Sequence, residues 1–290
     1  MTEEFRYENV SHADAFAANL ANWEDRVPIH LEQYGLEAFD DPQHRSTVVT
    51  QDVPVLERFA GPLRGQSLVH LQCHIGSDTV SLARSGARVT GVDFSASALE
   101  AARGLAHRTG ADATFVESNV YGAAEAVKAA GVGPADVVYT SIGTIGWLPD
   151  LFAWAREIFA LLRPGGTFMI RDGHPFALVF DPDAPEPLTP RFHYFAGSQA
   201  ERWQDSTTYV GDGSQVVEHA TTYSWPHPVS EILQAILAAG LKLEHFDEGK
   251  ELPWELIPTM SKLPNGDYVL PQAYAQSVPL TFTLVAHRPA

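Results

Sequence analysis

Short apolar runs alternate with longer stretches of helical periodicity from about residue 65 onward. We expect a buried strand wherever such a run is rich in branched and aromatic residues and is bounded by turn residues. Five runs meet this description, at 67–71, 88–93, 113–116, 135–139 and 167–171. Strands that alternate with helices at this rhythm predict a parallel, doubly wound α/β sheet with helices on both faces.

The helices between these strands carry their own start and stop signals. The helix after the second strand is expected to begin at Ser95 or Ser97, because Ser97 and Glu100 have the spacing of a capping box. Gly110 is the expected residue just beyond its C-terminus. Apolar residues recur at helical spacing over 151–161 and predict a further helix.

Two regions fall outside this alternation. Residues 1–62 contain helical patterns at 13–23 and 53–59, and are expected to form an N-terminal helical lid or extension ahead of the main domain at 63–290. Residues 174–226 are rich in Pro and aromatic residues and are too long for a plain loop. We expect this stretch to be an insertion after the fifth strand that covers a site.

The C-terminal part adds a helix at 229–239 and two strands, at 241–246 and 280–287. No clear crossover helix separates these last two strands, so we expect them to form an antiparallel pair at one edge of the sheet. The complete sheet then has seven strands.

Charge and composition exclude several classes of partner. The 290 residues include 19 Lys and Arg and 36 Asp and Glu, for a net charge of −17. Nucleic acids and anionic membrane surfaces bind through clustered Lys and Arg, so both are disfavoured as partners. No apolar run approaches the roughly 20 residues of a spanning helix. Residues 1–6 are polar and acidic, and Cys73 is the single cysteine, so we expect no signal peptide, no disulfide and a cytoplasmic location.

The turn after the first strand is the first candidate for a ligand site, because ligands of open α/β sheets bind beyond the carboxyl ends of the strands. A dinucleotide-binding turn there requires G-x-G-x-x-G, but HLQCHIG at 70–76 contains only Gly76. This weakens the interpretation as an NAD-dependent oxidoreductase.

Two polar residues follow the next strands. Asp93 ends the second strand, 93 − 76 = 17 residues after the glycine, where a carboxylate can accept hydrogen bonds from both hydroxyls of a ribose. The alternative is that Asp93 only caps the following helix. Asn119 follows the third strand, and either accepts from an adenine amino group or only forms a turn.

The motifs LVHLQCHIGSDT at 68–79 and GVDFS at 91–95 resemble a bacterial family of class I S-adenosylmethionine (SAM)-dependent methyltransferases, whose first motif reads L-H-L-Q-C-H-F-G-x-D-T. Further matches are WEDRVPIH at 23–30, YTSIG at 139–143, WLPD at 147–150, GHPF at 173–176, and YSW at 223–225 with His227 and Glu231-Ile232. The resemblance implies a Rossmann-like, seven-stranded methyltransferase fold. It also implies SAM, converted to S-adenosylhomocysteine (SAH), held by residues Gln72, Cys73, His74, Gly76, Asp93, Phe94, Asn119, Val120 and Ser141.

Three positions depart from the broader superfamily. That superfamily has an acid where His70 stands and glycines where Gln72 and His74 stand. The methionine amino group of SAM is then expected to contact backbone carbonyls. Relatives also have Asp at the position of Asn119.

The resemblance implies methyl transfer to a small molecule by in-line displacement. The fold hosts nitrogen, oxygen, sulfur and carbon acceptors, of which we favour nitrogen or oxygen. His174 is the candidate general base, because an imidazole titrates near neutrality, or else it is a structural histidine beside Pro175. Trp147 lines either the pocket or the core. Trp225 either frames the pocket or fixes the insertion.

Trp23, Arg26 and His30 form a polar and aromatic cluster on the expected lid. Arg26 pairs either with the SAM carboxylate or with a surface acid. No metal is expected, because the histidines lack ligand spacing such as H-E-x-x-H. Besides an enzyme, a non-catalytic protein that binds SAM on the same fold remains an alternative.

Overall fold

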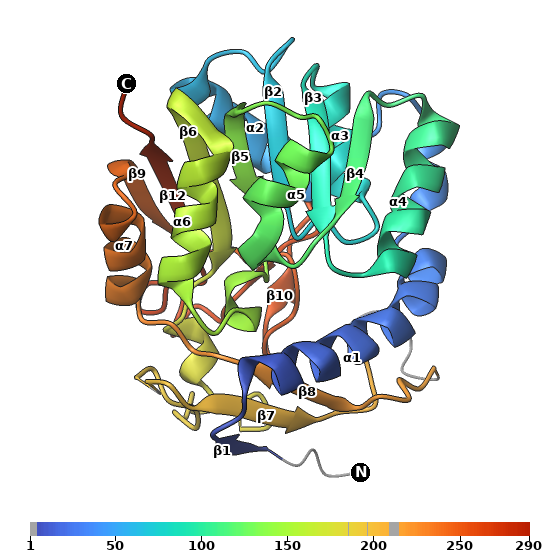
Figure 1. Ribbon diagram of the computed structural model, residues 1–290. Helices are drawn as coiled ribbons and strands as arrows, with labels where there is room; N and C mark the ends of the chain where they lie inside the picture. The colour runs from blue at the N-terminus through green and yellow to red at the C-terminus, as the bar shows by residue number, and fades with distance from the viewer. Residues whose placement is uncertain (1–4, 185, 196, 209–214) are drawn as a thin grey trace.

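The computed structural model describes residues 5–184, 186–195, 197–208 and 215–290. Its centre is a seven-stranded sheet with the strand order β4-β3-β2-β5-β6-β12-β9 (Figure 1). The pairs β2–β3, β3–β4, β2–β5 and β5–β6 are parallel, whereas β12 runs antiparallel to both β6 and β9. The predicted sheet and its late antiparallel pair are confirmed. The strands are β2 (Ser67–Leu71), β3 (Arg88–Asp93), β4 (Ala113–Glu117), β5 (Ala135–Thr140), β6 (Leu162–Gly173), β9 (Lys242–Gly249) and β12 (Thr281–His287).

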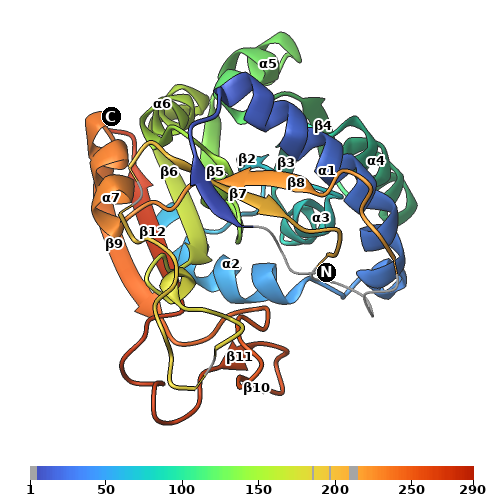
Figure 2. The ribbon, with the colours of Figure 1, turned by 90° about the horizontal axis from the view of Figure 1, so that it is seen from below.

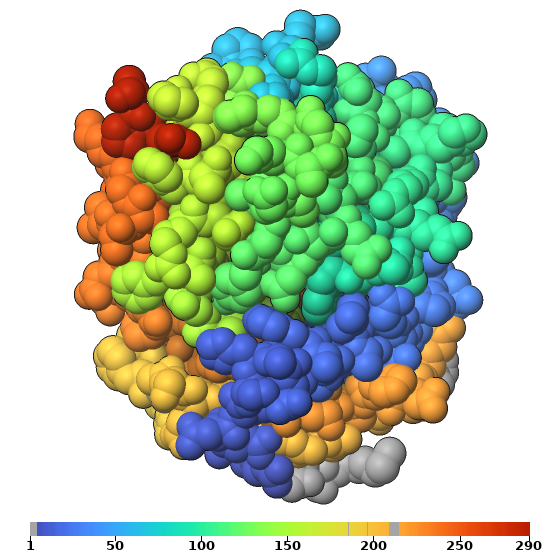
Figure 3. All heavy atoms as spheres, in the orientation of Figure 1, coloured from blue at the N-terminus to red at the C-terminus, as the bar shows by residue number. Residues whose placement is uncertain are grey.

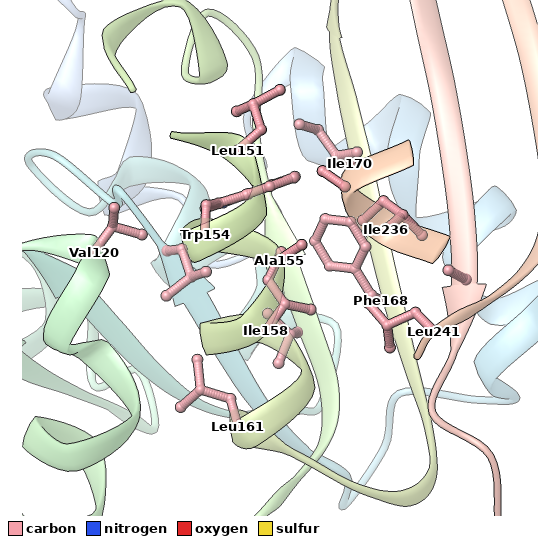
Figure 4. Close-up of a cluster of buried hydrophobic side chains, with 14 of the residues drawn as sticks. Val120, Leu151, Trp154, Ala155, Ile158, Leu161, Phe168, Ile170, Ile236 and Leu241 are labelled. Atoms are coloured by element: carbon pink, nitrogen blue, oxygen red, sulfur yellow. The ribbon is translucent and has the colours of Figure 1, made fainter. Parts of the chain in front are cut away.

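Helices cover both faces of this sheet. On one face lie α5 (Ala123–Ala129), α6 (Leu151–Leu161) and α7 (Val229–Ala238), and on the other lie α2 (Thr47–Ala60), α3 (Ser77–Arg84) and α4 (Ala96–Thr109). Trp154 and Ile158 of α6 point at Phe168 and Ile170 of β6 in the larger core (Figure 4). The Trp154 and Phe168 rings meet edge to face, with their centroids 5.5 Å apart. The core therefore fixes β5 and β6, whose ends carry part of the site.

Local capping explains where α4 begins and ends. The Ser95 hydroxyl accepts from the backbone N–H of Ala98 at 3.0 Å, so Ser95 is the N-cap and the capping box predicted at Ser97 is not formed. Gly110 ends the helix in the left-handed conformation, as predicted. The N-cap of α4 therefore lies two residues beyond Asp93.

The N-terminal region and the insertion meet across the carboxyl ends of the parallel strands. Helix α1 (His12–Gln33) continues well beyond the predicted 13–23, through Pro28. The short strands β1 (Arg6–Glu8), β7 (Ala200–Gln204) and β8 (Thr221–Ser224) form a separate antiparallel sheet. Figures 1 and 2 show α1 and β8 side by side below the main sheet, and in Figure 3 the atoms of α1 form a band across this edge.

Polar side chains join α1 to β8. The Asn19 side chain accepts from the Tyr223 N–H at 2.8 Å and donates to the Tyr223 carbonyl at 2.9 Å. Asn22 donates to the His219 carbonyl at 2.7 Å. These bonds satisfy backbone groups of β8 and of His219 just before it, so α1 and the small sheet form one unit.

The segment between β9 and β12 was not resolved into elements by the sequence pattern. It contains the two-residue strands β10 (Ser261–Lys262) and β11 (Tyr268–Val269). Its Leu252 and Ile257 pack with Ala177 of the insertion in a small separate core. Single 3-10 turns complete the fold: η1 (Leu36–Asp40), η2 (Val120–Gly122), η3 (Ile145–Trp147) and η4 (Ala177–Val179). Among the described residues, no helix has the length and apolar character to cross a membrane.

Candidate functional site

A cavity of about 860 Å³ opens at the carboxyl ends of the parallel strands. This volume lies near the upper end of the range for small-molecule sites, roughly 300–1,000 Å³. The cavity lies at the point where the strand order reverses between β2 and β5, which is where ligands of open α/β sheets bind. Eleven sequence-predicted residues line it: Trp23, Arg26, Gln72, Cys73, His74, Asp93, Phe94, Asn119, Val120, Ser141 and Trp147.

Asp93 lies at the tip of β3 with 8% of its surface exposed. One carboxylate oxygen accepts from the N–H of His74 at 2.8 Å, and the other accepts from the N–H of Ser95 at 3.0 Å. Burial raises the pKa of Asp93 to about 6, against the lowering effect of these N–H groups. Each carboxylate oxygen can accept two hydrogen bonds, so both retain capacity for a ligand hydroxyl. Because Ser95 caps α4, Asp93 does not serve as its N-cap.

The turn between β2 and α3 is held in an unusual conformation. Gln72 (φ 55°) and His74 (φ 48°) are both left-handed, at the two positions where the superfamily has glycines. A side chain in this region costs about 1–2 kcal/mol. The Gln72 amide donates to the Thr144 carbonyl at 3.1 Å, and the His74 N–H is bound by Asp93. These two hydrogen bonds thus stabilise a left-handed conformation that glycines adopt in the superfamily without them.

Gly76 does not line the cavity. It is the N-cap of α3 with φ 80°, and a Cβ on it would lie 2.7 Å from the Ala102 Cβ and 3.3 Å from the Phe115 ring. The glycine is therefore required by the close packing of the turn on α4 and β4.

Aromatic residues from the turn, α1 and η3 form one wall of the cavity. The Trp23 ring lies 5.1 Å from His74 and 5.5 Å from Trp147, and the Arg26 guanidinium lies 5.3 Å from the Trp23 ring centroid. Arg26 is 8% exposed, so it faces the cavity rather than solvent. His30 lies behind this wall, outside the lining, with its Nδ1 2.8 Å from the His74 Nε2. Burial lowers the pKa of His30 to about 4 and that of His74 to about 3, so both imidazoles are neutral at neutral pH.

Asn119 and Ser141 both line the cavity but also have local partners. The Asn119 side chain accepts from the Tyr121 N–H at 3.1 Å and caps η2. The Ser141 hydroxyl lies 3.1 Å from the His70 Nε2. Cys73 is buried against the turn, and burial raises the pKa of its thiol, which does not favour a nucleophilic role.

The structure does not bring His174 or Trp225 to the cavity lining. His174 accepts from the Phe176 N–H through Nδ1 at 3.1 Å, and its Nε2 lies 2.9 Å from Glu248. Burial lowers the pKa of His174 despite this carboxylate. Trp225 is buried beside Ala15 in the small core under α1. These contacts match the structural alternatives for both residues.

Asp172 anchors the loop after β5, a role that the sequence pattern did not reveal. Its buried carboxylate accepts from the N–H groups of Gly143 at 2.6 Å, Thr144 at 2.9 Å and Ile145 at 3.1 Å, and from the Thr144 hydroxyl at 3.0 Å. Burial raises the pKa of Asp172, and these N–H groups oppose the rise. This anchor fixes the segment that carries Ser141 and Trp147.

Sequence reasoning also missed part of the lining. One end of the cavity is formed by the segment between β9 and β12, through Pro253, Trp254, Glu255, Lys262, Gly266 and Tyr268. No periodic signal marks this segment, so its place over the strand ends depends on the tertiary fold. Asp78, which belongs to the 68–79 motif, also lines the cavity without having been assigned a role. Among the residues that the structure describes, no group of three or more His, Cys, Asp or Glu is placed to hold a metal ion.

Residues 69–168, which include the turn, Asp93 and Asn119, match the family model of a methyltransferase domain. A ubiquinone biosynthesis O-methyltransferase from Vibrio parahaemolyticus is 36% identical over 112 residues, covering 39% of this chain and 45% of that protein. The corresponding protein of Sodalis glossinidius is 32% identical over 163 residues, covering 56% of this chain and 59% of its own. The matched segments thus span about half the length of these curated relatives.

Solved structures share the fold over more of the chain. A SAM-dependent methyltransferase from Anabaena variabilis aligns over 98% of this chain and 97% of its own, with a TM-score of 0.61 at 18% identity. Another from Clostridium acetobutylicum aligns over 84% and 92%, with a TM-score of 0.54 at 10% identity. The chain has the Rossmann-like fold of class I methyltransferases.

Proposed function

We propose that this protein is a SAM-dependent methyltransferase that transfers a methyl group to an oxygen or nitrogen of a small molecule by in-line displacement. The observation that carries the proposal is the placement of Asp93 beside the left-handed turn in the wall of a large cavity. Both features lie within the part of the chain that matches a methyltransferase domain.

The chemistry of the cavity wall fits this cofactor. Both Asp93 oxygens retain acceptor capacity for the ribose hydroxyls. Within the described residues, the Gln72 Oε1 is buried without a hydrogen-bond partner and so offers an acceptor to a ligand N–H group. Phe94, Asn119 and Val120 line the neighbouring wall, where they would hold the adenine. Arg26 would hold the methionine carboxylate.

When bound, SAM supplies an activated methyl group on a positively charged sulfur. The protein's contribution is to orient the reactants and to exclude water. Positioning alone can supply roughly 7–11 kcal/mol of the barrier. The Trp23 and Trp147 rings provide aromatic faces that tolerate a cation, and α1 with the small sheet shields the strand ends.

The acceptor would lie at the cavity end formed by the segment between β9 and β12, under α1 and the small sheet. We infer that α1 and the small sheet of β1, β7 and β8 act as its cover, whereas α2, at residues 47–60 of the expected lid, packs on a face of the main sheet. The relatives are named for methylation at oxygen in ubiquinone biosynthesis, which favours an oxygen acceptor here. Because His174 lies outside the lining, it is not our choice for a general base.

Calorimetry with SAH and a methyl-transfer assay test this proposal together. The assay uses radiolabelled SAM with a panel of phenols, catechols and amines. We expect saturable SAH binding and label transfer to at least one class of acceptor. Absence of SAH binding contradicts the proposal, and binding without turnover on the whole panel favours a non-catalytic SAM-binding protein.

A further inference from the structure

Asp78 has no part in the function argued above, although it lies in the wall of the same cavity. It occupies the first turn of α3, directly after the turn that contains Gln72 and His74. Its carboxylate faces the hydroxyls of Ser46 and Ser141, which lower its pKa, whereas burial has the larger effect and raises it. Arg171 also lowers the pKa of Asp78 through its charge, but among the described residues only hydroxyls face this carboxylate as polar partners. A partly buried carboxylate of this kind in a cavity wall can accept a cationic ligand group.

The first strand offers no negative charge near Asp78. His70 stands where the superfamily has an acid, and burial lowers its pKa to about 3, so it is neutral. Its Nδ1 lies 2.9 Å from the Thr79 hydroxyl and its Nε2 lies 3.1 Å from the Ser141 hydroxyl. A neutral imidazole held between two hydroxyls does not replace the missing carboxylate.

The same contacts orient Ser141 toward Asp78. With its single hydrogen directed at the Asp78 carboxylate, the Ser141 hydroxyl would accept from the His70 Nε2–H, 3.1 Å away. The result is a fixed chain from β2 through the end of β5 to α3, across the point where strand order reverses. Asp78 is thus held in place before any ligand arrives.

The charges on the cavity wall match an amino-acid group. Arg26 from α1 supplies a positive charge, and Asp78 supplies a negative one. The remaining charged lining residues lie elsewhere: Asp93 marks the ribose end, and Glu255 and Lys262 are exposed on the segment between β9 and β12. An ammonium group donates three hydrogen bonds and accepts none, which suits the Asp78 carboxylate and the unpartnered Gln72 Oε1 together.

We propose that Asp78 binds the α-ammonium group of the methionine moiety of SAM and takes over the role of the acid that is missing from the first strand. The inference rests on the proposed function, because it assigns one more contact to the same cofactor. It places the ammonium at the end of β5 and leaves the carboxylate to Arg26.

A two-ligand, two-protein comparison by calorimetry tests this contact. The ligands are SAH and the analogue of SAH that lacks only the α-amino group, and the proteins are the wild type and Asp78→Asn. The wild type is expected to bind SAH roughly 10- to 100-fold more tightly than the analogue, the range for one charge-assisted hydrogen bond. In Asp78→Asn this ratio is expected to fall to within a few-fold of 1, because the Gln72 Oε1 and the new Asn amide remain as neutral acceptors, with analogue affinity unchanged.

The outcomes separate the inference from the function on which it rests. If the wild type binds neither ligand, the proposed function fails. If Asp78→Asn keeps the wild-type ratio, Asp78 does not bind the ammonium, and a change confined to the KM of the acceptor would assign it to the acceptor instead. Asp112→Asn, an exposed change of the same charge, is the matched control. Analogue binding reports an intact cavity in each variant, and Asp78→Ser provides a second variant should Asp78→Asn not fold.

Discussion

The Asp93 carboxylate accepts a hydrogen bond from the backbone N–H of His74 at 2.8 Å, so the tip of β3 holds the turn after β2 in its left-handed form. One side chain therefore has two tasks, because the same carboxylate faces the cavity with capacity for a ribose. Changes at Asp93 should affect both the ligand and the turn.

Replacing Asp93 with Ala should abolish detectable SAH binding in calorimetry while the protein stays folded. The change removes both ribose acceptors and leaves two N–H groups unpaired, at about 1–3 kcal/mol each when buried. Removing a carboxylate whose charged form is disfavoured by burial offsets part of this loss. Circular dichroism checks the fold, with Asp112→Ala as the exposed control. Unchanged affinity for SAH would remove Asp93 from the site.

The raised pKa of Asp93 predicts how SAH binding and stability depend on pH. SAH affinity should fall as the pH drops through about 6, because the protonated acid accepts ribose hydrogen bonds less well. His74 and His30, with pKa values of about 3 and 4, do not titrate near 6. Asp93→Asn should lose the part of this dependence centred near pH 6, whereas any effect of protonating Asp78, whose pKa burial also raises, is common to both proteins. A wild-type affinity that stays constant between pH 5 and 7 would contradict the assignment.

The contribution of Asp93 to folding stability depends on pH in the opposite direction to its contribution to SAH binding. Its pKa in the folded protein is about 6 against an ordinary 3.8, so the folded state holds more protons between these values. This contribution therefore falls as the pH rises from about 4 to 6, and the full penalty is present above 6. Urea unfolding of the wild type and Asp93→Asn across this range checks the sign: their difference should shift in favour of the Asn variant as the pH rises.

At position 72, a Gly variant should be more stable than an Ala variant, which is the reverse of the usual order. At φ 55° an Ala pays the left-handed cost without the amide bond to the Thr144 carbonyl, whereas a Gly pays no such cost. We expect Gln72→Gly to be more stable than Gln72→Ala by about 1 kcal/mol in urea unfolding. An Ala variant at least as stable as the Gly variant would show that the turn relaxes out of this conformation.

Gly76→Ala should destabilise the protein by roughly 2–4 kcal/mol, from overpacking against Ala102 and the left-handed conformation. Adding Ala102→Gly removes the 2.7 Å contact and should restore part of the loss. If the second change restores nothing, the close approach to α4 is not the reason for a glycine here.

His174→Gln should leave kcat within about threefold of the wild type, because His174 lies outside the cavity lining. A general base would instead contribute about 10²–10⁴-fold. The variant is assayed with whichever acceptor the panel identifies, and its unfolding is measured beside it. A loss of a hundredfold in kcat with unchanged stability would return His174 to the mechanism.

Local patterns were sufficient for the main sheet but not for the whole site. The strands from Ser67 to Asp93 and the tip position of Asp93 follow from apolar runs and turn residues, whose signals are local. The requirement for glycine at position 76 has a different origin. A Cβ there would collide with Ala102, and only the packing of α4 brings these two residues together. The long anchor at Asp172 likewise joins β6 to the loop after β5, a relationship with no sequence period.

The cavity end formed by the segment between β9 and β12 shows most clearly what sequence patterns cannot predict. Trp254 and Tyr268 come from a segment with little regular structure, and they reach the cavity because that segment folds back over the strand ends. His174 shows the same limit: the sequence left a general base and a structural histidine open, and in the structure this side chain faces Glu248 and does not line the cavity. The direction in which a side chain points at a strand end depends on the neighbouring strands, here β9 and β12, and cannot be read from its position in the sequence.

A crystal structure with SAH bound tests the central claim most directly. We predict that both ribose hydroxyls lie within hydrogen-bond distance of the Asp93 carboxylate and that the sulfur faces the end of the cavity formed by Trp254 and Tyr268. An SAH molecule bound elsewhere, or a crevice beside Asp93 that stays filled by side chains at saturating SAH, would contradict the account.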